Sequence, residues 1–157
     1  MKNKCTLIID ANWLLMSRFS IMSDRFKLDV PEKAKEAAQN ELHELMAKSI
    51  IIVLNRFPSM DNIVFVSDGG SWRKQLPIPK SLEDTTYKGN RIHEPEHDWK
   101  YIYGALSELS DICNSIGITT SHQFGIEGDD WVWYWSRRLN ADGTSCIIWS
   151  SDNDLKQ

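Results

Sequence analysis

Short runs rich in β-branched and aromatic residues alternate along this chain with longer segments of helical character. Strands are expected at residues 6–10, 62–67, 118–121 and 146–150. Helices are expected at residues 13–22, 31–57, 98–116 and 127–139. Strand–helix alternation without hairpin signals is typical of parallel, doubly wound sheets. The sequence therefore predicts an α/β fold with a mostly parallel central sheet and helices on both faces.

Proline and glycine mark several of the expected boundaries. Pro31 suits the first position of the long second helix, and Pro58 stops that helix. Asp98 can cap the third helix, which Gly117 ends. The stretch from residue 70 to residue 97 contains three prolines that interrupt any long helix, namely Pro77, Pro79 and Pro95. We expect that stretch to be a mobile excursion with short helical turns.

Length and composition are those of one globular domain, spanning residues 1–157. Hydrophobic residues make up 41% and charged residues 25%. No apolar run approaches the roughly 20 residues of a membrane-spanning helix, and no signal segment precedes the first strand. Cys5, Cys113 and Cys146 are odd in number and lack metal-ligand spacing. Buried thiols in a reducing cytoplasm are therefore expected, with no membrane partner.

Acidic residues follow each predicted strand or open the following helix. There are seven of them: Asp10, Asp68, Glu127, Asp129, Asp130, Asp152 and Asp154. Because the carboxyl ends of parallel strands share one edge of a sheet, these acids should converge there. Such a cluster is too repulsive to persist without cations, so the pattern indicates a divalent-metal site for phosphoryl transfer.

Each acid also has a purely structural interpretation. Asp10 can be a helix N-cap and Asp68 a turn residue before two glycines. The acids at 127–130 can complement the positive end of a helix dipole, and those at 152–154 can cap a terminal helix. These roles do not explain why the acids recur at successive sheet edges. That joint occurrence favours the metal site.

Positive charge is concentrated near the acids although the net charge is −4. The stretch from residue 71 to residue 91 carries five basic residues: Arg73, Lys74, Lys80, Lys88 and Arg91. A basic stretch beside a metal cluster suits a polyphosphate substrate. The histidines are scattered and form no nucleophilic triad; they are His43, His93, His97 and His122.

The tryptophan-rich segment at 131–135 can stack on bases or pack on the sheet. Val132, Trp135 and Leu139 have helical spacing, so packing is the preferred interpretation. Trp131 or Trp133 would then lie on the other face. Trp13 is also expected to pack, although it lies near the predicted site.

The order of five motifs resembles the bacteriophage 5′-nuclease family of the PIN-like superfamily. These motifs are LIIDAN, VFVSDGGSWRKQL, YKGNR, IEGDD and SSDND. The family includes phage flap endonucleases, 5′→3′ exonucleases and the phage RNase H branch, to which this chain looks closest. GDD stands where the family usually has ADD. The resemblance implies a PIN-like catalytic domain with a helical-arch insertion at about 70–97.

The resemblance also implies roles for individual residues. The first metal would be held by Asp68, Glu127 and Asp129, with Asp10 acting through water. The second would be held by Asp130, Asp152 and Asp154. Mg²⁺ is the implied cofactor and Mn²⁺ a competent substitute, because all the ligands are oxygens.

Substrate contacts are implied for the arch. Lys88 and Arg91 would act in catalysis with Asp68 and Asp129 by gripping the scissile phosphate. Tyr87 would stack on a base at an unpaired 5′ end. Arg73 and Lys74 are candidates for contacts to the nucleic-acid backbone.

The implied substrates are DNA with a 5′ flap or an RNA–DNA hybrid, in the host cytoplasm. Relatives continue into a helix–hairpin–helix part, which is absent here, and a further segment or second chain is expected to supply it. The isolated chain should then bind one metal better than two. Two alternatives remain, a PIN-type single-strand endoribonuclease and a non-catalytic nucleic-acid-binding fragment.

Overall fold

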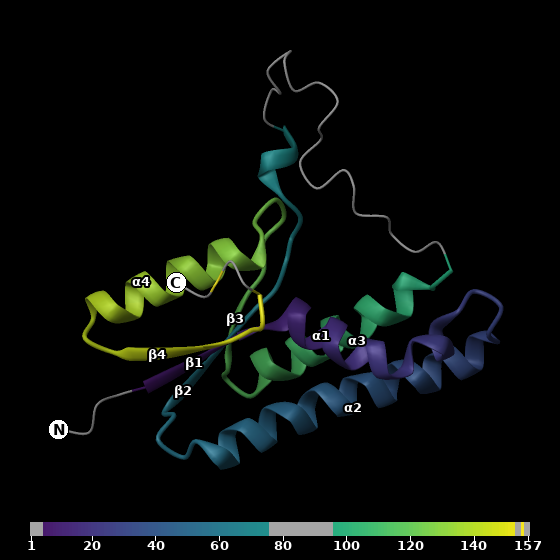
Figure 1. Ribbon diagram of the computed structural model, residues 1–157, viewed down its shortest axis with the longest axis horizontal. Coiled ribbons are helices and arrows are strands. Elements are labelled where there is room, and N and C mark those ends of the chain that lie inside the picture. Colours follow the sequence, from purple (N-terminus) through teal and green to yellow (C-terminus); the bar gives the residue numbers. More distant parts are fainter. Residues whose placement is uncertain (1–4, 76–95, 153–154, 156–157) are drawn as a thin grey trace.

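The computed structural model describes residues 5–75, 96–152 and 155. Helices and strands alternate along the described chain (Figure 1). In order they are β1 (Cys5–Asp10), α1 (Ala11–Met22), η1 (Ser23–Phe26), α2 (Glu32–Arg56), β2 (Asn62–Val66), η2 (Trp72–Gln75), α3 (Trp99–Ser115), β3 (Thr119–Ser121), α4 (Gly128–Ala141) and β4 (Ser145–Trp149). The predicted elements are confirmed, with ends shifted by a few residues.

The strands form one parallel sheet in the order β3-β2-β1-β4. β1 lies between β2 and β4, with Asp10 opposite Val66 and Ile9 opposite Trp149. The last residues of these three strands therefore lie side by side. The predicted parallel sheet with a common carboxyl edge is confirmed.

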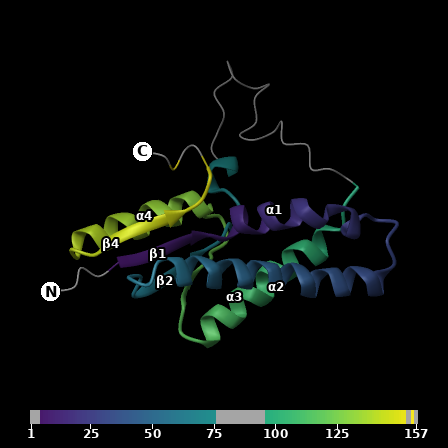
Figure 2. The same ribbon diagram turned by 60° about the horizontal axis from the view of Figure 1, so that its bottom comes forward.

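Alternate residues of the strands face two different hydrophobic clusters. Leu7, Ile9 and Phe65 belong to a large core with α1, α2 and α3. Ile8 and Val64 belong to a smaller core with Val132 of α4. Figures 1 and 2 show α4 on one side of the strands and the other three helices on the opposite side. The prediction of helices on both faces is confirmed.

α1 begins immediately after β1, two residues earlier than expected. Asp10 is its N-cap, and the helix needs no linker because the strand's last side chain satisfies its first turn. At the end of α3, Gly117 adopts a φ of +85°, which a glycine accommodates without strain. The expected helix stop at Gly117 is confirmed.

The predicted capping role of Asp98 is wrong. Asp98 occupies the N-cap position of α3 but makes no side-chain capping bond. Its Oδ2 instead accepts a hydrogen bond of 3.0 Å from Nζ of Lys35, on α2. The Lys35 side chain is only 7% exposed, and a buried ammonium requires a negative partner.

The aromatic residues of α4 divide between core and surface. Val132 is buried, and Trp135 and Leu139 pack against the same cluster, as predicted. Trp135 Nε1 donates to Ser121 Oγ at 2.9 Å. Trp131 also packs against this cluster, whereas Trp133 and Tyr134 are exposed.

The other bulk predictions have mixed outcomes. Cys113 is buried and its burial raises the pKa of its thiol, whereas Cys5 and Cys146 are half-buried. All three cysteines are free. Trp13 packs edge-on against Trp149, as expected. Among the described residues, no helix combines the length and apolar character needed to cross a membrane.

The predicted excursion begins with the short helix η2. After the excursion, Glu96 O accepts a hydrogen bond of 2.9 Å from Leu28 N. Leu28 lies between η1 and α2, so this bond connects the chain before α3 to that region. Residues 76–95, which hold most of the expected arch, lie outside the described part of the chain.

Candidate active site at the carboxyl edge of the sheet

Asp10 lies at the centre of the carboxyl edge and is 7% exposed. Its Oδ1 accepts a bond of 3.0 Å from Trp13 N, and its Oδ2 accepts one of 2.8 Å from Ser150 Oγ. Burial raises the pKa of its carboxyl; those two bonds oppose the rise, and the charges of Asp68 and Asp152 add to it. Asp10 is thus a helix cap and an electrostatic neighbour of two other predicted site residues.

Asp68 follows β2 and is held between α1 and α4. Its backbone N–H donates to Asn12 Oδ1 at 2.8 Å. Its Oδ1 accepts a hydrogen bond from Gly128 N, the first residue of α4. The positive end of α4 therefore faces this carboxylate. Asp68 thereby lies beside the residues that open α4, as the sequence predicted.

The start of α4 is closed by a reciprocal capping box. Glu127 accepts from the backbone of Asp130, and the Asp130 side chain accepts from Glu127 N at 3.4 Å. This is the structural role that the sequence suggested for acids at a helix start. Capping leaves further oxygens on both carboxylates available to another partner.

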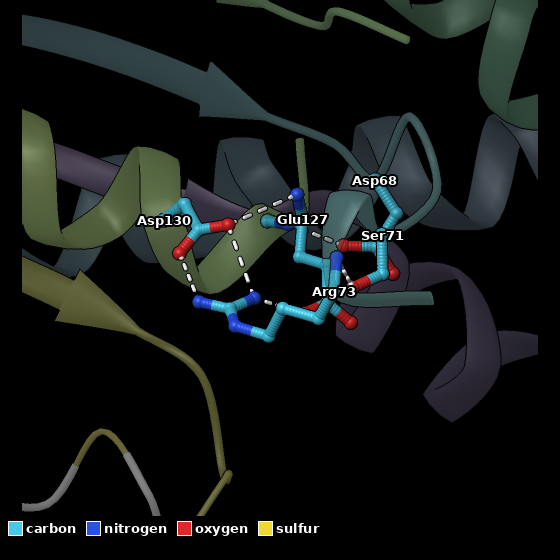
Figure 3. A network of polar contacts seen from close by, with 6 residues as sticks. Asp68, Ser71, Arg73, Glu127 and Asp130 are labelled. Carbon is cyan, nitrogen blue, oxygen red and sulfur yellow. Dashed lines mark hydrogen bonds and ion pairs between the residues drawn. The ribbon is translucent and has the colours of Figure 1, made fainter. Parts of the chain in front are cut away.

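That partner is Arg73 of η2, whose guanidinium bridges the two carboxylates (Figure 3). Nη1 pairs with Glu127 Oε2, and Nη2 lies 2.5 Å from Asp130 Oδ1. Nη1 also donates to Asp130 Oδ2 at 3.2 Å. Hydrogen bonding to Asp130, with a further contribution from Glu127, raises the pKa of the guanidinium. An arginine thus neutralises part of the acidic edge.

Backbone hydrogen bonds between two loops hold Arg73 beside Glu127 and Asp130. Trp72 N donates to Gly125 O at 2.6 Å, and Gly69 N donates to Ile126 O at 2.8 Å. A Cβ on Gly69 would lie 1.8 Å from Gln123 O, so only glycine permits this approach. These bonds fix the backbone of the β2–η2 loop against the loop before α4.

Gly128, where the family usually has alanine, approaches Asp68 closely. A Cβ at this position would lie 2.8 Å from Asp68 Oδ1. Glycine at this position therefore allows a tight carboxylate contact at the helix start.

The remaining predicted site residues are placed less completely. Asp152 follows β4, and its N–H bonds to Ser150 Oγ at 3.1 Å. Asp129 lies in the first turn of α4. The Lys74 side chain is outside the described atoms, and four further predicted residues lie outside the described ranges: Tyr87, Lys88, Arg91 and Asp154. Their predicted roles stay predictions.

Within the described ranges, no three carboxylate, histidine or cysteine side chains are close enough to hold a metal ion together. The donor chemistry nevertheless fits a hard divalent cation, because the converging side chains are oxygen donors. Arg73 supplies positive charge to Glu127 and Asp130.

Sequence reasoning missed several residues that build the edge. Asn12 and Ser150 orient Asp68 and Asp10, and both stand inside motifs that were noted only for their acids. The ion pairs of Arg73 were also missed, because this side chain was interpreted as a nucleic-acid contact. Its partners lie 54 and 57 residues further along the chain.

Comparison with known proteins finds a relative in sequence. The 5′-3′ exonuclease of Buchnera aphidicola subsp. Schizaphis graminum (strain Sg) is 30% identical over 112 residues, which are 71% of this chain and 36% of that protein. No family model matches the chain.

Solved structures from bacteriophage T5 share the fold. A T5 protein co-crystallised with metal ions aligns with a TM-score of 0.65 and 17% identity, over 96% of this chain and 50% of that chain. The T5 5′-exonuclease with bound zinc aligns with a TM-score of 0.64 and 15% identity, over 98% and 51%. The chain thus shares its fold with these solved 5′-nucleases.

A third T5 structure carries nucleic acid. The T5 flap endonuclease in a complex with DNA and metal ions aligns with a TM-score of 0.62 and 18% identity, over 96% of this chain and 50% of that one. The chain therefore spans about half the length of these solved 5′-nucleases and a smaller share of the exonuclease. The predicted α/β fold with a parallel sheet is confirmed, and these 5′-nucleases share it.

Proposed function

We propose that this chain is the catalytic portion of a divalent-metal-dependent 5′→3′ exonuclease or flap endonuclease. One observation carries the proposal: the strands that precede or end in Asp10, Asp68 and Asp152 are neighbours in one parallel sheet and finish at its carboxyl edge. Asp68 also bonds to the start of the helix that bears Asp129 and Asp130. The 5′-3′ exonuclease relative and the T5 nucleases support the same activity.

The reaction is hydrolysis of a phosphodiester. Water attacks phosphorus in line, the bond to the 3′ oxygen breaks, and the products are a 5′-phosphate and a 3′-hydroxyl. Bound Mg²⁺, or Mn²⁺ in its place, would supply an activated water and stabilise the leaving oxygen.

The protein's own residues provide binding sites and orientation. Asp68, Glu127 and Asp129 would hold the first cation, with Asp10 positioned to orient a water. Asp130, Asp152 and Asp154 would approach the second. Arg73 engages one carboxylate assigned to each cation, Glu127 and Asp130. We expect the isolated chain to bind one cation more tightly than two.

Substrate binding is assigned to the segment after η2. Lys88 and Arg91 would hold the scissile phosphate, Tyr87 would stack on a base, and Lys74 would contact the backbone. The proposed substrates are DNA with a 5′ flap and RNA–DNA hybrids, as in RNA-primer removal, in the cytoplasm of a host cell. A further segment or a second chain would increase the affinity for duplex nucleic acid.

Cleavage assays test the proposal directly. The chain is incubated with an end-labelled 5′-flap duplex, an RNA–DNA hybrid and single-stranded RNA, each with Mg²⁺ or with chelator. We expect Mg²⁺-dependent cleavage near the flap junction or from the hybrid's 5′ end, abolished by Asp68→Asn or Asp129→Asn.

Other results would contradict the proposal. Cleavage of single-stranded RNA alone would identify a PIN-type endoribonuclease. Metal-independent binding without cleavage would identify a non-catalytic binding fragment. Activity that survives Asp68→Asn would come from a contaminating nuclease.

A further inference from the structure

Arg73 occupies carboxylate oxygens that the proposed metal site needs. Its two terminal nitrogens engage three oxygens, one of Glu127 and both of Asp130 (Figure 3). We propose that Arg73 is the built-in counter-ion of the metal-free site and that a divalent cation displaces its side chain from Glu127 and Asp130. This inference rests on the proposed function, which assigns both carboxylates to metal binding.

The metal-free protein requires a cation at this place. The Glu127 side chain is only 8% exposed, and a charge so deeply buried is strongly unfavourable without a partner. Asp68 and Asp130 bring further negative charge to the same helix start. The helix dipole supplies only a partial positive charge, so a full positive charge from Arg73 stabilises the folded chain.

Arg73 and a divalent cation compete because they use the same oxygens. Glu127 Oε2 and both oxygens of Asp130 already accept hydrogen bonds from the guanidinium. A divalent cation held at these oxygens would lie against the guanidinium, and like charges at such a distance repel strongly. Binding of a divalent cation to either carboxylate therefore requires the Arg73 guanidinium to release that carboxylate.

The surroundings allow the side chain to leave without unfolding. Its backbone is fixed by the Trp72–Gly125 bond, and Arg73 N donates to Ser71 Oγ at 3.2 Å. The side chain itself is 30% exposed. It already lies 5.1 Å from the ring of Trp72, which is 47% exposed and gives the guanidinium an alternative partner. Only side-chain torsions need to change.

Calorimetric titration of Mn²⁺ and Mg²⁺ into the metal-free chain tests the competition. Arg73→Gln removes the competing charge, so we expect cation affinity to rise on the order of three- to tenfold, a range reduced for partial solvent exposure. Arg73→Lys keeps the charge without the bidentate geometry, so its cation affinity should lie between those of the wild type and Arg73→Gln. Arg138→Gln, which removes an exposed pair with Asp142 on the same helix α4, should leave the affinity unchanged.

Thermal unfolding of the same variants gives a second readout. Without metal, Arg73→Gln should unfold at a lower temperature than the wild type, and saturating Mg²⁺ should narrow this difference. A difference that is unchanged by Mg²⁺ would contradict displacement.

NMR signals of the arginine side chains report displacement of Arg73 in the wild-type protein. The Arg73 signal, assigned by its absence in Arg73→Lys, should show restricted rotation in chelator and free rotation with Mg²⁺.

Unchanged cation affinity in Arg73→Gln, or an Arg73 signal whose rotation stays restricted with Mg²⁺, would overturn the proposal. If the chain cleaves flaps in Mg²⁺ while Arg73 stays in place, only this inference fails. If it neither binds Mg²⁺ nor cleaves, the proposed function fails as well.

Discussion

At the scale of single residues, the acidic side chains of the carboxyl edge serve the fold before they serve any chemistry. Asp10 caps α1, Glu127 and Asp130 cap α4, and Asp68 bonds to Gly128 N. Each carboxylate is thereby oriented by backbone N–H groups of rigid helices. Structural and functional interpretations of these acids are compatible, because one oxygen can cap a helix while the other faces the edge.

Two substitutions of Asp10 should separate these roles. Asp10→Asn keeps an acceptor oxygen for Trp13 N, and its amide NH₂ can donate to Ser150 Oγ. It also removes a carboxylate charge that burial disfavours, so the free energy of unfolding should change little. Asp10→Ala loses both bonds and should cost about 1–2 kcal/mol. Both should abolish Mg²⁺-dependent cleavage. Chemical denaturation beside a flap-cleavage assay measures the two effects, and equal destabilisation by both variants would contradict the capping role.

A tight backbone approach sets the position of Arg73. Gly69→Ala should cost about 2 kcal/mol or more, because its Cβ would lie 1.8 Å from Gln123 O. Gly70→Ala is the matched control: its Cβ meets open space, and its φ of +90° should cost only about 1 kcal/mol. Urea unfolding of the two variants compares them. If Gly69→Ala destabilised the fold less than Gly70→Ala, the contact between the β2–η2 loop and the loop before α4 would not be tight.

At the scale of elements, α2 and α3 are joined near their starts by a group of polar contacts. Lys35 Nζ reaches Asp98 at 3.0 Å and Leu28 O at 3.3 Å, and it lies 5.8 Å from the ring of Tyr101. Tyr101 in turn donates to Glu32 at 2.7 Å. This group ties the starts of both helices together at the place where the chain returns from residues 76–95.

Replacing only one partner of the Lys35–Asp98 pair should destabilise the fold more than replacing both partners. Asp98→Asn leaves the Lys35 ammonium buried without its counter-charge and should cost about 2 kcal/mol. Adding Lys35→Met to Asp98→Asn should recover part of that loss. A double-mutant cycle from denaturant unfolding measures the coupling. Strict additivity of the two changes would mean that the pair contributes nothing.

At the scale of the whole molecule, sequence patterns predicted the sheet edge but not its electrostatic neutralisation. Parallel strands necessarily bring Asp10 and Asp68 to one edge, and helical spacing placed Val132 in the core. The Arg73 ion pairs depend on two loops meeting at Gly69 and Gly125, which no local pattern encodes. The Asp98 cap failed for the same reason, since Lys35 reaches it across 63 positions of sequence.

Cation binding should stabilise the whole chain. At a Mg²⁺ concentration about 100 times the dissociation constant, linkage predicts a gain of about 2.7 kcal/mol. Asp68→Asn should remove that gain, whereas Asp142→Asn, an exposed acid at the other end of α4, should retain it. Scanning calorimetry with Mg²⁺ and with chelator measures the difference. Stabilisation that survives Asp68→Asn would place the cation elsewhere.

The central position of β1 makes this design intolerant of insertions and deletions. Ladder bonds on both sides hold Asp10 at the edge, while Leu7 and Ile9 point to one core and Ile8 to the other. Deleting one residue would exchange the two apolar sets and withdraw the aspartate from its neighbours in the same step. A deletion or insertion of a single residue within β1 would therefore cost folding and chemistry together.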